Sequence, residues 1–455
     1  MQKHYETGKT LKPSIIIIGG GLAGCEAAWQ LLKKNIQVTL YEMKPRVFSP
    51  AHKSHSLAEL VCSNSLRSNM LTNAVGLLKE EMRMLESLIM EAADATAVPA
   101  GKALAVNRKD FSHYIEERLL AHTSLEIIRD EISEIPLDRT VIIASGPLTS
   151  EALSRSIALL TGSEYLYFYD AISPIIHGDS IDPHIVFRAS RYENDKGDYL
   201  NCPFTKDEYE GFWKVLTEAE EVPLRPFEEF RFFSGCLPIE IMARSGMQTL
   251  AFGPMKPVGL INPTTGKQPY AVVQLRQEDK DGSLFNIVGF QTKLTWPEQR
   301  RIFRTIPGLS GVEFARYGSI HRNTFINAPI LLKQTLQLKM HEKIFFAGQI
   351  TGVEGYVESA AMGLAAGLAV ASFVMGKDIT PFPDETAMGS LLRYITRQDH
   401  RNFQPMNVNF GLFPPLPGKI PKKDRGGHYA QRSLDALEKW KLSTSESYQA
   451  APDTV

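Results

Sequence analysis

Apolar and polar positions at the start of the chain follow the order of a strand, a glycine turn, a helix and a second strand. The four segments are SIIII, GGGLAG, CEAAWQLLKKN and IQVTLYE, residues 14–18, 19–24, 25–35 and 36–42. Short β-branched runs predict strands, and the apolar positions of the third segment recur with helical spacing. We therefore predict a βαβ unit whose helix ends near Asn35.

The same two periodicities predict further elements along the chain. Helices are expected over 76–91, over the first part of 108–128, which ends in a strand, and from Thr205 onward; strands are expected over 140–147, 270–278 and 285–294. Near the C-terminus, residues 343–367 repeat the opening order of strand, glycine-rich turn and helix. Because the pattern occurs at both ends of the chain, we predict that the two ends build one cofactor-binding unit.

The longest apolar stretch is AAMGLAAGLAVASFVMG, residues 360–376. It is slightly short for a membrane span, is interrupted by glycines and is rich in small residues. We predict a tightly packed helix inside the cofactor-binding unit, not a membrane span. The N-terminal segment MQKHYETGKTLKP lacks the apolar core of a signal peptide. We therefore expect a cytoplasmic protein without a membrane partner.

Composition narrows the class of protein further. The chain has 455 residues, of which 43% are hydrophobic and 22% charged, as is usual for soluble globular proteins. Its net charge is −1, so any nucleic-acid contact requires a local basic surface. The 4 cysteines form no C-x-x-C pair, which argues against a zinc site and a disulfide scaffold and suggests a reducing compartment.

The glycine turn carries the strongest chemical signal. Gly19, Gly21 and Gly24 form G-x-G-x-x-G directly after a strand and into a helix. Their expected roles are the tight turn, close approach to a pyrophosphate, and close helix–strand packing. Glu42 ends the second strand, where a carboxylate binds ribose hydroxyls. We predict a dinucleotide site that includes Gly19, Gly20, Gly21, Leu22, Ala23, Gly24 and Glu42.

A second turn near the C-terminus favours FAD over NAD. Flavoproteins of the two-dinucleotide type return to the cofactor at an Ala-Gly turn, here Ala347-Gly348. A helix that starts near Gly355 would direct its N-terminus at the flavin ring and favour the reduced anion. Many such proteins have an Asp after Ala-Gly, whereas this chain has Gln349. Gly348, Gln349 and Gly355 complete the predicted cofactor site.

These patterns predict an α/β fold, a Rossmann-like two-dinucleotide-binding FAD domain with an inserted α+β substrate domain. The expected divisions are 1–150 (first part of the FAD domain), 151–325 (inserted region, facing the substrate), 326–440 (second part of the FAD domain) and 441–455 (polar tail). The inserted region is rich in aromatic residues, prolines and predicted strands.

Two cysteines lie in predicted turns. Cys62 follows an apolar lead-in and precedes a polar run ending in Arg67 and Ser68, and Cys236 stands in SGCLPIE. Either thiol is reactive only if its pKa is lowered, which a sequence does not reveal. From the residues alone, a structural and a chemical role remain equally open, because free cysteines are usually buried and inert.

The other candidate ligands favour packing over chemistry. Cys25 lies on the first turn of the cofactor helix and Cys202 precedes a proline, so both are expected to be structural. His52 and His55 are three positions apart, but no third ligand is near them in the sequence. We expect them in a loop near the cofactor or the folate and predict no metal.

A basic segment near the C-terminus is a candidate RNA surface. Its cations include Arg393, Arg397, Lys419, Lys422, Lys423 and Arg425, and it also contains Phe403, Phe410, Phe413 and Tyr429. A second cluster consists of Arg300, Arg301 and Arg304. Cations bind phosphates and aromatic rings stack on unpaired bases. A merely solvated face is the alternative interpretation.

At this point the residues resemble a known family. IIGGGLAGCEAAWQL, LYEMKP, AELVCSNSLRS, YLNCPFTKDEYE, GCLPIEIMARSG, FGPMKPVGL and AGQITGVEGYVESAAMG are similar to the TrmFO family of folate- and FAD-dependent tRNA (uracil-5-)-methyltransferases. The resemblance implies methylation of C5 of the T-loop uridine (position 54) in tRNA, with 5,10-methylenetetrahydrofolate as donor and FADH2, recharged by NAD(P)H, as reductant. It implies the T-arm of tRNA as partner and catalytic roles for Cys62 and Cys236.

The chemistry explains why two thiols and a flavin suffice. C5 of uracil becomes a carbon nucleophile when a thiolate adds at C6, a base then removes the C5 proton, and a hydride completes the methyl group. We expect Cys236 to be the nucleophile and Cys62 the base or proton-transfer partner, with the exchanged assignment as the alternative. Other hypotheses are a GidA-like flavoprotein that modifies another uridine, an NAD(P)H:flavin oxidoreductase without an RNA partner, and a non-catalytic FAD-containing RNA-binding protein.

Overall fold

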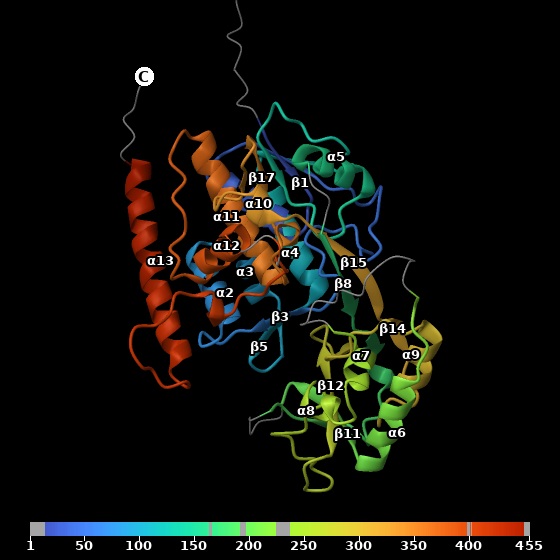
Figure 1. Cartoon of the computed structure of the whole chain (residues 1–455). Coiled ribbons are helices and arrows are strands. Elements are labelled where there is room, and N and C mark those ends of the chain that lie inside the picture. The colour runs from blue at the N-terminus through green and yellow to red at the C-terminus, as the bar shows by residue number, and fades with distance from the viewer. Residues whose placement is uncertain are drawn as a thin grey trace, which may run out of the picture.

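A computed structural model shows two bodies joined by a pair of strands (Figure 1). It describes residues 14–162, 166–191, 197–223, 237–397, 401 and 403–449. One buried core contains residues from the beginning and the end of the chain, between Ile15 and Ile157 and between Phe325 and Leu437. The other core lies between Ile176 and Val312. The two ends of the chain therefore fold together, with the middle as a separate body.

The first body is built on a six-stranded sheet in the order β16-β17-β7-β1-β2-β6. The bounds are β1 Ile15–Ile18, β2 Val38–Tyr41, β6 Leu125–Ile128, β7 Val141–Ile143, β16 Gln337–Leu338 and β17 His341–Phe346. All pairs are parallel except β16 with β17. The core strand β1 is apolar throughout because a parallel sheet is covered on both faces. This is the doubly wound arrangement that the opening pattern predicts.

Two helices from opposite ends of the chain pack against each other beside this sheet. They are α1, Leu22–Leu32, and α11, Tyr356–Val374. A Cβ atom on Gly363 would lie 2.2 Å from the carbonyl oxygen of Ala23, and one on Gly367 would lie 2.9 Å from that of Ala27. The small residues of the long apolar stretch therefore serve close helix packing. By length and composition α11 could cross a membrane, but 78% of its apolar window is buried inside the fold.

The second body contains a sheet in the order β10-β11-β12-β13-β9-β14. Its strands and the strands and helices around it are β9 Ile175–His177, β10 Phe187–Arg188, β11 Tyr199–Phe204, α6 Lys206–Thr217, α7 Ile239–Arg244, α8 Thr249–Phe252, β12 Ala271–Gln277, β13 Leu284–Ile287, α9 Trp296–Phe303 and β14 Phe314–Arg316. Helix α6 begins where the sequence predicts, because Thr205 and Glu208 form a capping box. The strand expected over 285–294 is shorter, since the chain turns at Gly289, which has φ +78°.

The two bodies are connected by β8, Leu166–Ile172, and β15, Ser319–Phe325, which pair antiparallel along their whole length. They run between the upper and lower bodies in Figure 1. A three-stranded sheet of β3 Ser65–Ser68, β5 Ala103–Val106 and β4 Ala97–Val98 lies on the lower side of the first body. The segment with Cys62 therefore leads into an edge that faces the second body.

The prediction of a single helix over 76–91 is wrong. The structure has two helices, α2 Ala74–Met84 and α3 Leu88–Ala95. Glu86 adopts a left-handed conformation with φ 57°, and the Ser87 hydroxyl accepts a hydrogen bond from the Met90 N–H. Ser87 therefore caps a new helix. The apolar periodicity runs across both helices, so it does not reveal the break between them.

The remaining helices complete the first body. They are α4 Arg108–Leu120, α5 Glu151–Thr161, α10 Ala328–Leu331, α12 Ala387–Arg397 and α13 Arg425–Gln449. Residues 441–449, expected to belong to a polar tail, continue α13. The helix is fixed there because the Trp440 ring stacks on Phe382 at 4.4 Å and the Lys441 ammonium donates to the Met84 carbonyl oxygen at 2.6 Å.

Candidate active site at the glycine turn and the Cys62 loop

The glycine turn leaves the N-terminus of α1 open. Gly19 has φ +109°, and a Cβ there would lie 2.5 Å from the Ala144 carbonyl oxygen. A Cβ on Gly24 would lie 1.8 Å from the Gly19 carbonyl oxygen, whereas a Cβ on Gly21 would meet nothing within 4 Å. Gly21 caps α1 without a side-chain hydrogen bond, so the first backbone N–H groups of the helix are available to an anion. Gly19 and Gly24 thus serve the fold, and Gly21 borders open space.

Glu42 braces the same turn. One carboxylate oxygen accepts from the Gly20 N–H at 2.9 Å and the other from the Lys44 N–H at 3.0 Å. The side chain is 6% exposed at the end of β2. Each carboxylate oxygen can accept a further hydrogen bond, so the group can hold the turn and a hydroxyl at the same time.

The second glycine turn lies beside the first. Gly348 has φ +81°, and a Cβ there would lie 2.7 Å from the Ala23 Cβ. A short 3₁₀ turn, Gln349–Thr351, follows it. Gly355 has φ +111° and precedes α11, where a Cβ would lie 2.4 Å from a Glu358 carboxylate oxygen. Both turns require glycine, and Gly348 brings the end of β17 to the start of α1.

A cavity joins these turns. Its lining includes Gly19, Gly21, Leu22, Ala23, Glu42, Lys44, His52, Glu59, Val61, Gly348, Gln349, Tyr356 and Ser359. The cavity also borders the segment from Ala144 to Ser150. Gly20, Gly24 and Gly355 are not among the residues that line it. The cavity thus runs from the open N-terminus of α1 past the Glu42 carboxylate to Val61, the residue before Cys62.

The Cys62 loop is held from both bodies. Its backbone N–H donates to the Tyr356 hydroxyl at 2.6 Å, and Tyr356 lines the cavity. Its carbonyl oxygen accepts from the guanidinium of Arg316 at 2.9 Å and from that of Arg108 at 3.1 Å. Arg316 also donates to the Val61 carbonyl oxygen at 2.7 Å. An arginine of the second body therefore fixes the position of this loop beside the cavity.

The thiol of Cys62 is protonated at neutral pH. The residue is half-buried, and burial of the thiol, reinforced by the charge of Asp170, raises its pKa to about 12 against the opposing charges of Arg316 and Arg108. Arg67, the nearest cation in the sequence, instead pairs with the buried Glu358. Because the thiolate is the nucleophilic form, this thiol is suited to holding and moving a proton in the unliganded protein.

Further charged groups are buried beneath the loop. The Arg276 guanidinium donates to the Asn64 side-chain oxygen at 2.9 Å and to the Ser63 hydroxyl at 2.7 Å. Arg108 pairs with Glu278, which is 4% exposed. Burial lowers the pKa of Arg276. A fully buried guanidinium is retained only where hydrogen bonds and a counter-charge compensate its desolvation, so the loop rests on a rigid polar foundation.

Other titratable groups gather around the cavity. Burial raises the pKa of Glu354, whose carboxylate accepts from the Gln349 side-chain amide at 2.6 Å. Burial and the charge of Arg316 lower the pKa of His321 to about 4. Burial also lowers the pKa of His52, so both imidazoles are neutral at pH 7. His52 lines the cavity.

Sequence reasoning missed Arg316, Arg108, Tyr356, Glu354 and His321. Tyr356 and Glu354 flank a glycine already assigned to the site, so proximity to Gly355 is a signal that could have found them. Arg316 and His321 lie in the middle of the chain; Arg316 contacts the Cys62 loop, and its charge acts on His321, only because the inserted region folds against this loop. Within the described residues, no group of three or more His, Cys, Asp or Glu side chains could hold a metal ion.

The remaining cysteines behave differently. Cys25 and Cys202 are buried, and burial raises the pKa of both, which agrees with structural roles. Cys236 lies outside the described residues. The expectation that Cys236 acts together with Cys62 in catalysis therefore stays a prediction.

The expected RNA surface divides into two sets. The side chains of Lys419, Lys422, Lys423 and Arg425 are exposed where the chain approaches α13. Arg397 is exposed too and donates to the Gln334 side chain at 2.8 Å, whereas Arg393 is half-buried and donates to Asp384 at 3.0 Å and to the Leu412 carbonyl oxygen. The aromatic residues of this segment also differ from the expectation. Phe403 and Phe413 are buried, and Phe410 and Tyr429 stack on each other at 4.8 Å. These rings pack the core and leave the cations as the candidate RNA contacts.

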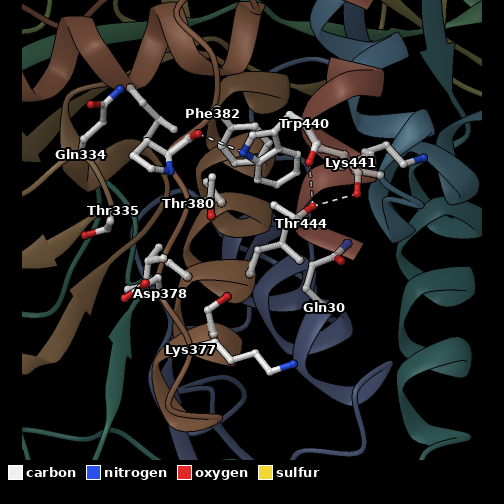
Figure 2. A pocket seen from close by; sticks show the side chains of 18 of the residues that line it. Gln30, Gln334, Thr335, Lys377, Asp378, Thr380, Phe382, Trp440, Lys441 and Thr444 are labelled. Carbon is white, nitrogen blue, oxygen red and sulfur yellow. Dashed lines mark hydrogen bonds between the residues drawn. The ribbon is translucent and has the colours of Figure 1, made fainter. Parts of the chain in front are cut away.

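A second hollow lies at the other end of α1, around Gln30, Thr335, Lys377, Trp440 and Lys441 (Figure 2). The Trp440 indole N–H donates to the Pro381 carbonyl oxygen at 2.9 Å. Within the part of the chain that the structure describes, no cysteine lines it. It marks the place where the C-terminal helix docks, away from the Cys62 loop.

Comparisons with known proteins show the family of the chain. Residues 14–378 match the family described as Glucose inhibited division protein A. The chain is 66% identical over 436 residues to "Methylenetetrahydrofolate--tRNA-(uracil-5-)-methyltransferase TrmFO" of Syntrophus aciditrophicus, covering 96% of this chain and 99% of that protein. It is 59% identical to the protein of the same name from Geobacter sulfurreducens, covering 94% and 98%.

Solved structures support the fold. Aquifex aeolicus GidA in its form I crystal superposes with a TM-score of 0.66 at 16% identity, covering 95% of this chain and 78% of that one. The form II crystal gives a TM-score of 0.65, covering 95% and 75%. At this identity the likeness concerns the fold alone, and it bears out the predicted Rossmann-like α/β class.

Proposed function

The chain belongs to the Glucose inhibited division protein A family and to the TrmFO methylenetetrahydrofolate–tRNA-(uracil-5-)-methyltransferases, and from this premise we propose that it methylates the T-loop uridine of tRNA at the cavity beside Cys62. It is an FAD-dependent enzyme that transfers a one-carbon unit from methylenetetrahydrofolate to C5 of uracil in tRNA. The observation that carries the proposal is a thiol-bearing loop set against a cavity that begins at an open helix N-terminus.

The described residues suit FAD. The open space next to Gly21 and the uncapped start of α1 would receive the pyrophosphate, and Glu42 retains acceptor capacity for a ribose hydroxyl. Gly348 and Gln349 would face the flavin half of the cofactor. When bound and reduced by NAD(P)H, FAD supplies the hydride that completes the methyl group. We therefore propose Gly19 to Gly24, Glu42, Gly348, Gln349 and Gly355 as the cofactor-binding set.

The pKa of Cys62 supports a division of roles between the two cysteines. A nucleophile at C6 must be a thiolate, and Cys62 holds its proton at neutral pH. We propose that Cys236 adds at C6 and that Cys62 first gives its own proton to the departing folate amine and then, as a thiolate, takes the proton of C5. A thiol with a pKa of about 12 is, once deprotonated, a strong base, and Arg316 and Arg108 hold its backbone in a fixed position.

The same proposal includes the partner surface, the domain division and the location. The T-arm would lie across the face between the two bodies, with phosphates near Lys422 and Lys423, which are exposed. Residues 1–150 and 326–440 would hold FAD, and the second body, which lies within 151–325, would face the RNA. The few cysteines and the tRNA substrate support a cytoplasmic location.

The test is a product assay on the purified protein. It is given tRNA lacking T-loop methylation, methylenetetrahydrofolate labelled in its one-carbon unit, and NADPH, and the digested tRNA is examined for labelled 5-methyluridine. Label at the T-loop is expected. Label at another uridine, or none from a protein that holds and reduces FAD, would favour a GidA-like enzyme or an oxidoreductase instead.

Variants test the cysteine roles in the same assay. Cys236→Ala is expected to form no covalent adduct with tRNA containing 5-fluorouracil, and Cys62→Ala is expected to form the adduct without releasing product. An adduct formed by Cys236→Ala would reverse the assignment. Cys202→Ala is a matched control, because that thiol is buried in the core of the second body.

A further inference from the structure

A column of parallel aromatic rings rises through the second body and ends at solvent. The centroids of Phe314 and Tyr317 are 4.8 Å apart with an interplanar angle of 19°, and those of Tyr317 and Trp296 are 5.4 Å apart at 16°. Below Phe314 stands the fully buried Phe303, 6.5 Å away. At the outer end Trp296 is 62% exposed. An indole ring is thus supported on one face by the core and open to solvent beyond it.

The column is held rigidly in the free protein. Trp296 is the first residue of α9. Gln299 of the same helix makes two hydrogen bonds to Gly318, the residue after Tyr317. The Gly318 N–H donates to the Gln299 side-chain oxygen at 2.8 Å, and the Gln299 amide donates to the Gly318 carbonyl oxygen at 3.0 Å. A preformed platform loses little conformational freedom on binding, so stacking on it costs less entropy than stacking on a mobile ring.

An arginine lies against the column. Arg300 donates to the Tyr317 hydroxyl at 2.8 Å, and its guanidinium carbon lies 5.7 Å from the centre of that ring. Arg301 pairs with Glu298, and the charge of Glu218 also acts on it, so Arg300 is the arginine of α9 that contacts the column. An exposed ring beside an arginine suits a ligand that has both a flat base and a phosphate.

The column also connects to the reacting thiol. Tyr317 directly follows Arg316, whose guanidinium donates to the carbonyl oxygens of Val61 and Cys62. Helix α9 and strand β14 lie together on one flank of the second body (Figure 1). Trp296 does not line the cavity beside Cys62. A base stacked on it would therefore be a different nucleotide from the one that reacts.

We propose that the exposed face of Trp296 stacks an unpaired base of the bound tRNA, with Arg300 next to its phosphate, and so strengthens the binding of the RNA whose target uridine reaches Cys62. The inference rests on the proposed function, because it assumes that tRNA is the substrate. A stacked base strengthens binding by about 5- to 150-fold. Trp296 acts by positioning the RNA and takes no part in the chemistry.

Binding and kinetics of four full-length FAD-containing proteins test this: the wild type, Trp296→Ala, Trp296→Phe and Phe252→Ala. We expect Trp296→Ala to raise the Kd and KM for tRNA by about 5- to 150-fold, with kcat at saturating tRNA and flavin reduction by NADPH unchanged. Trp296→Phe keeps a stacking ring and should stay within about 3-fold of the wild type. Phe252 is 79% exposed in the same body, so its alanine variant controls for loss of an exposed ring.

Tryptophan fluorescence gives a second readout. tRNA should quench the emission of the wild type, and Trp296→Phe should bind with similar affinity but lose that quenching component. The platform is refuted if Trp296→Ala binds tRNA like the wild type, if Phe252→Ala loses as much, or if Trp296→Ala changes only the oligomeric state in sedimentation. Failure of the proposed function looks different, because then the wild type itself forms no 5-methyluridine.

Discussion

Replacement of Gly21 by alanine should separate cofactor binding from folding. A Cβ on Gly21 meets nothing within 4 Å, whereas a Cβ on Gly24 lies 1.8 Å from the Gly19 carbonyl oxygen. The backbone of Gly21, with φ −76° and ψ −171°, is open to any residue. Gly21→Ala should therefore leave the fold intact and fill the space where we propose that the pyrophosphate approaches, while Gly24→Ala should force α1 away from the turn.

The two variants differ in the magnitude and the target of the effect. For Gly21→Ala, loss of unfolded-chain entropy stabilises by about 0.4–1 kcal/mol and the poorer helix cap offsets a similar amount. The free energy of unfolding of the apoprotein should thus stay within about 1 kcal/mol of the wild type. One lost charge-assisted hydrogen bond to a phosphate should weaken FAD binding by about 10- to 150-fold. For Gly24→Ala, overpacking should cost about 1–3 kcal/mol of folding stability.

The assay combines urea unfolding of the apoproteins with FAD titration followed by flavin fluorescence. Gly211→Ala is a matched control, because its Cβ also meets nothing within 4 Å and it lies in α6, remote from the cavity. It should bind FAD normally. If Gly21→Ala bound FAD as tightly as the wild type, the pyrophosphate would not lie at this turn. If the free energy of unfolding of the Gly21→Ala apoprotein fell by more than about 2 kcal/mol, the space beside Gly21 would not be open to a methyl group.

Three further outcomes are expected. With a pKa of about 12 against an ordinary 9.0, Cys62 should be alkylated by iodoacetamide at pH 8 about a thousandfold more slowly than a free thiol. The rate should keep rising beyond pH 10, and a plateau near pH 9 would contradict this. Burial raises the pKa of Glu81 to about 7, so its stabilising contribution is full below its unfolded pKa of 4.5 and is lost as pH rises through 7. The unfolding free energy of the wild type relative to Glu81→Gln should therefore increase by about 3 kcal/mol from pH 8 to pH 4.5, measured by urea titration; a constant difference would refute it. Charge reversal at Lys422 and Lys423 should weaken tRNA binding and lower its salt slope by about 2, and unchanged filter binding would exclude that surface.

Buried carboxylates show how the tertiary structure uses residues that the sequence presents as ordinary helix surface. Glu81, in α2, accepts from the N–H groups of Ala387 at 2.6 Å and Met388 at 2.9 Å, and also from the Ser433 hydroxyl. It thereby caps the N-terminus of α12 from a distant part of the chain. The pattern over 76–91 indicates an amphipathic helix but contains no sign that one acidic residue is fully buried.

The sequence by itself determined the elements whose causes are local. The βαβ unit, the capping box at Thr205 and the glycine turns follow from residues within a few positions of one another. A Cβ on Gly24 would meet the Gly19 carbonyl oxygen, so this contact lies within the segment, and Gly19 itself has a positive φ. These two features belong to the segment itself, which is why the pattern alone predicts them, whereas the contact of Gly19 with Ala144 depends on the rest of the fold.

Only the tertiary structure decided the surroundings of Cys62. The sequence has Arg67 as the neighbouring cation, but that guanidinium pairs with Glu358, while Arg108 and Arg316 bind the Cys62 carbonyl oxygen. The raised pKa of the thiol depends on burial, and burial arises where two bodies from distant parts of the chain meet. Desolvation and long-range charge are properties of a packed volume, so the spacing of residues along a chain does not encode them.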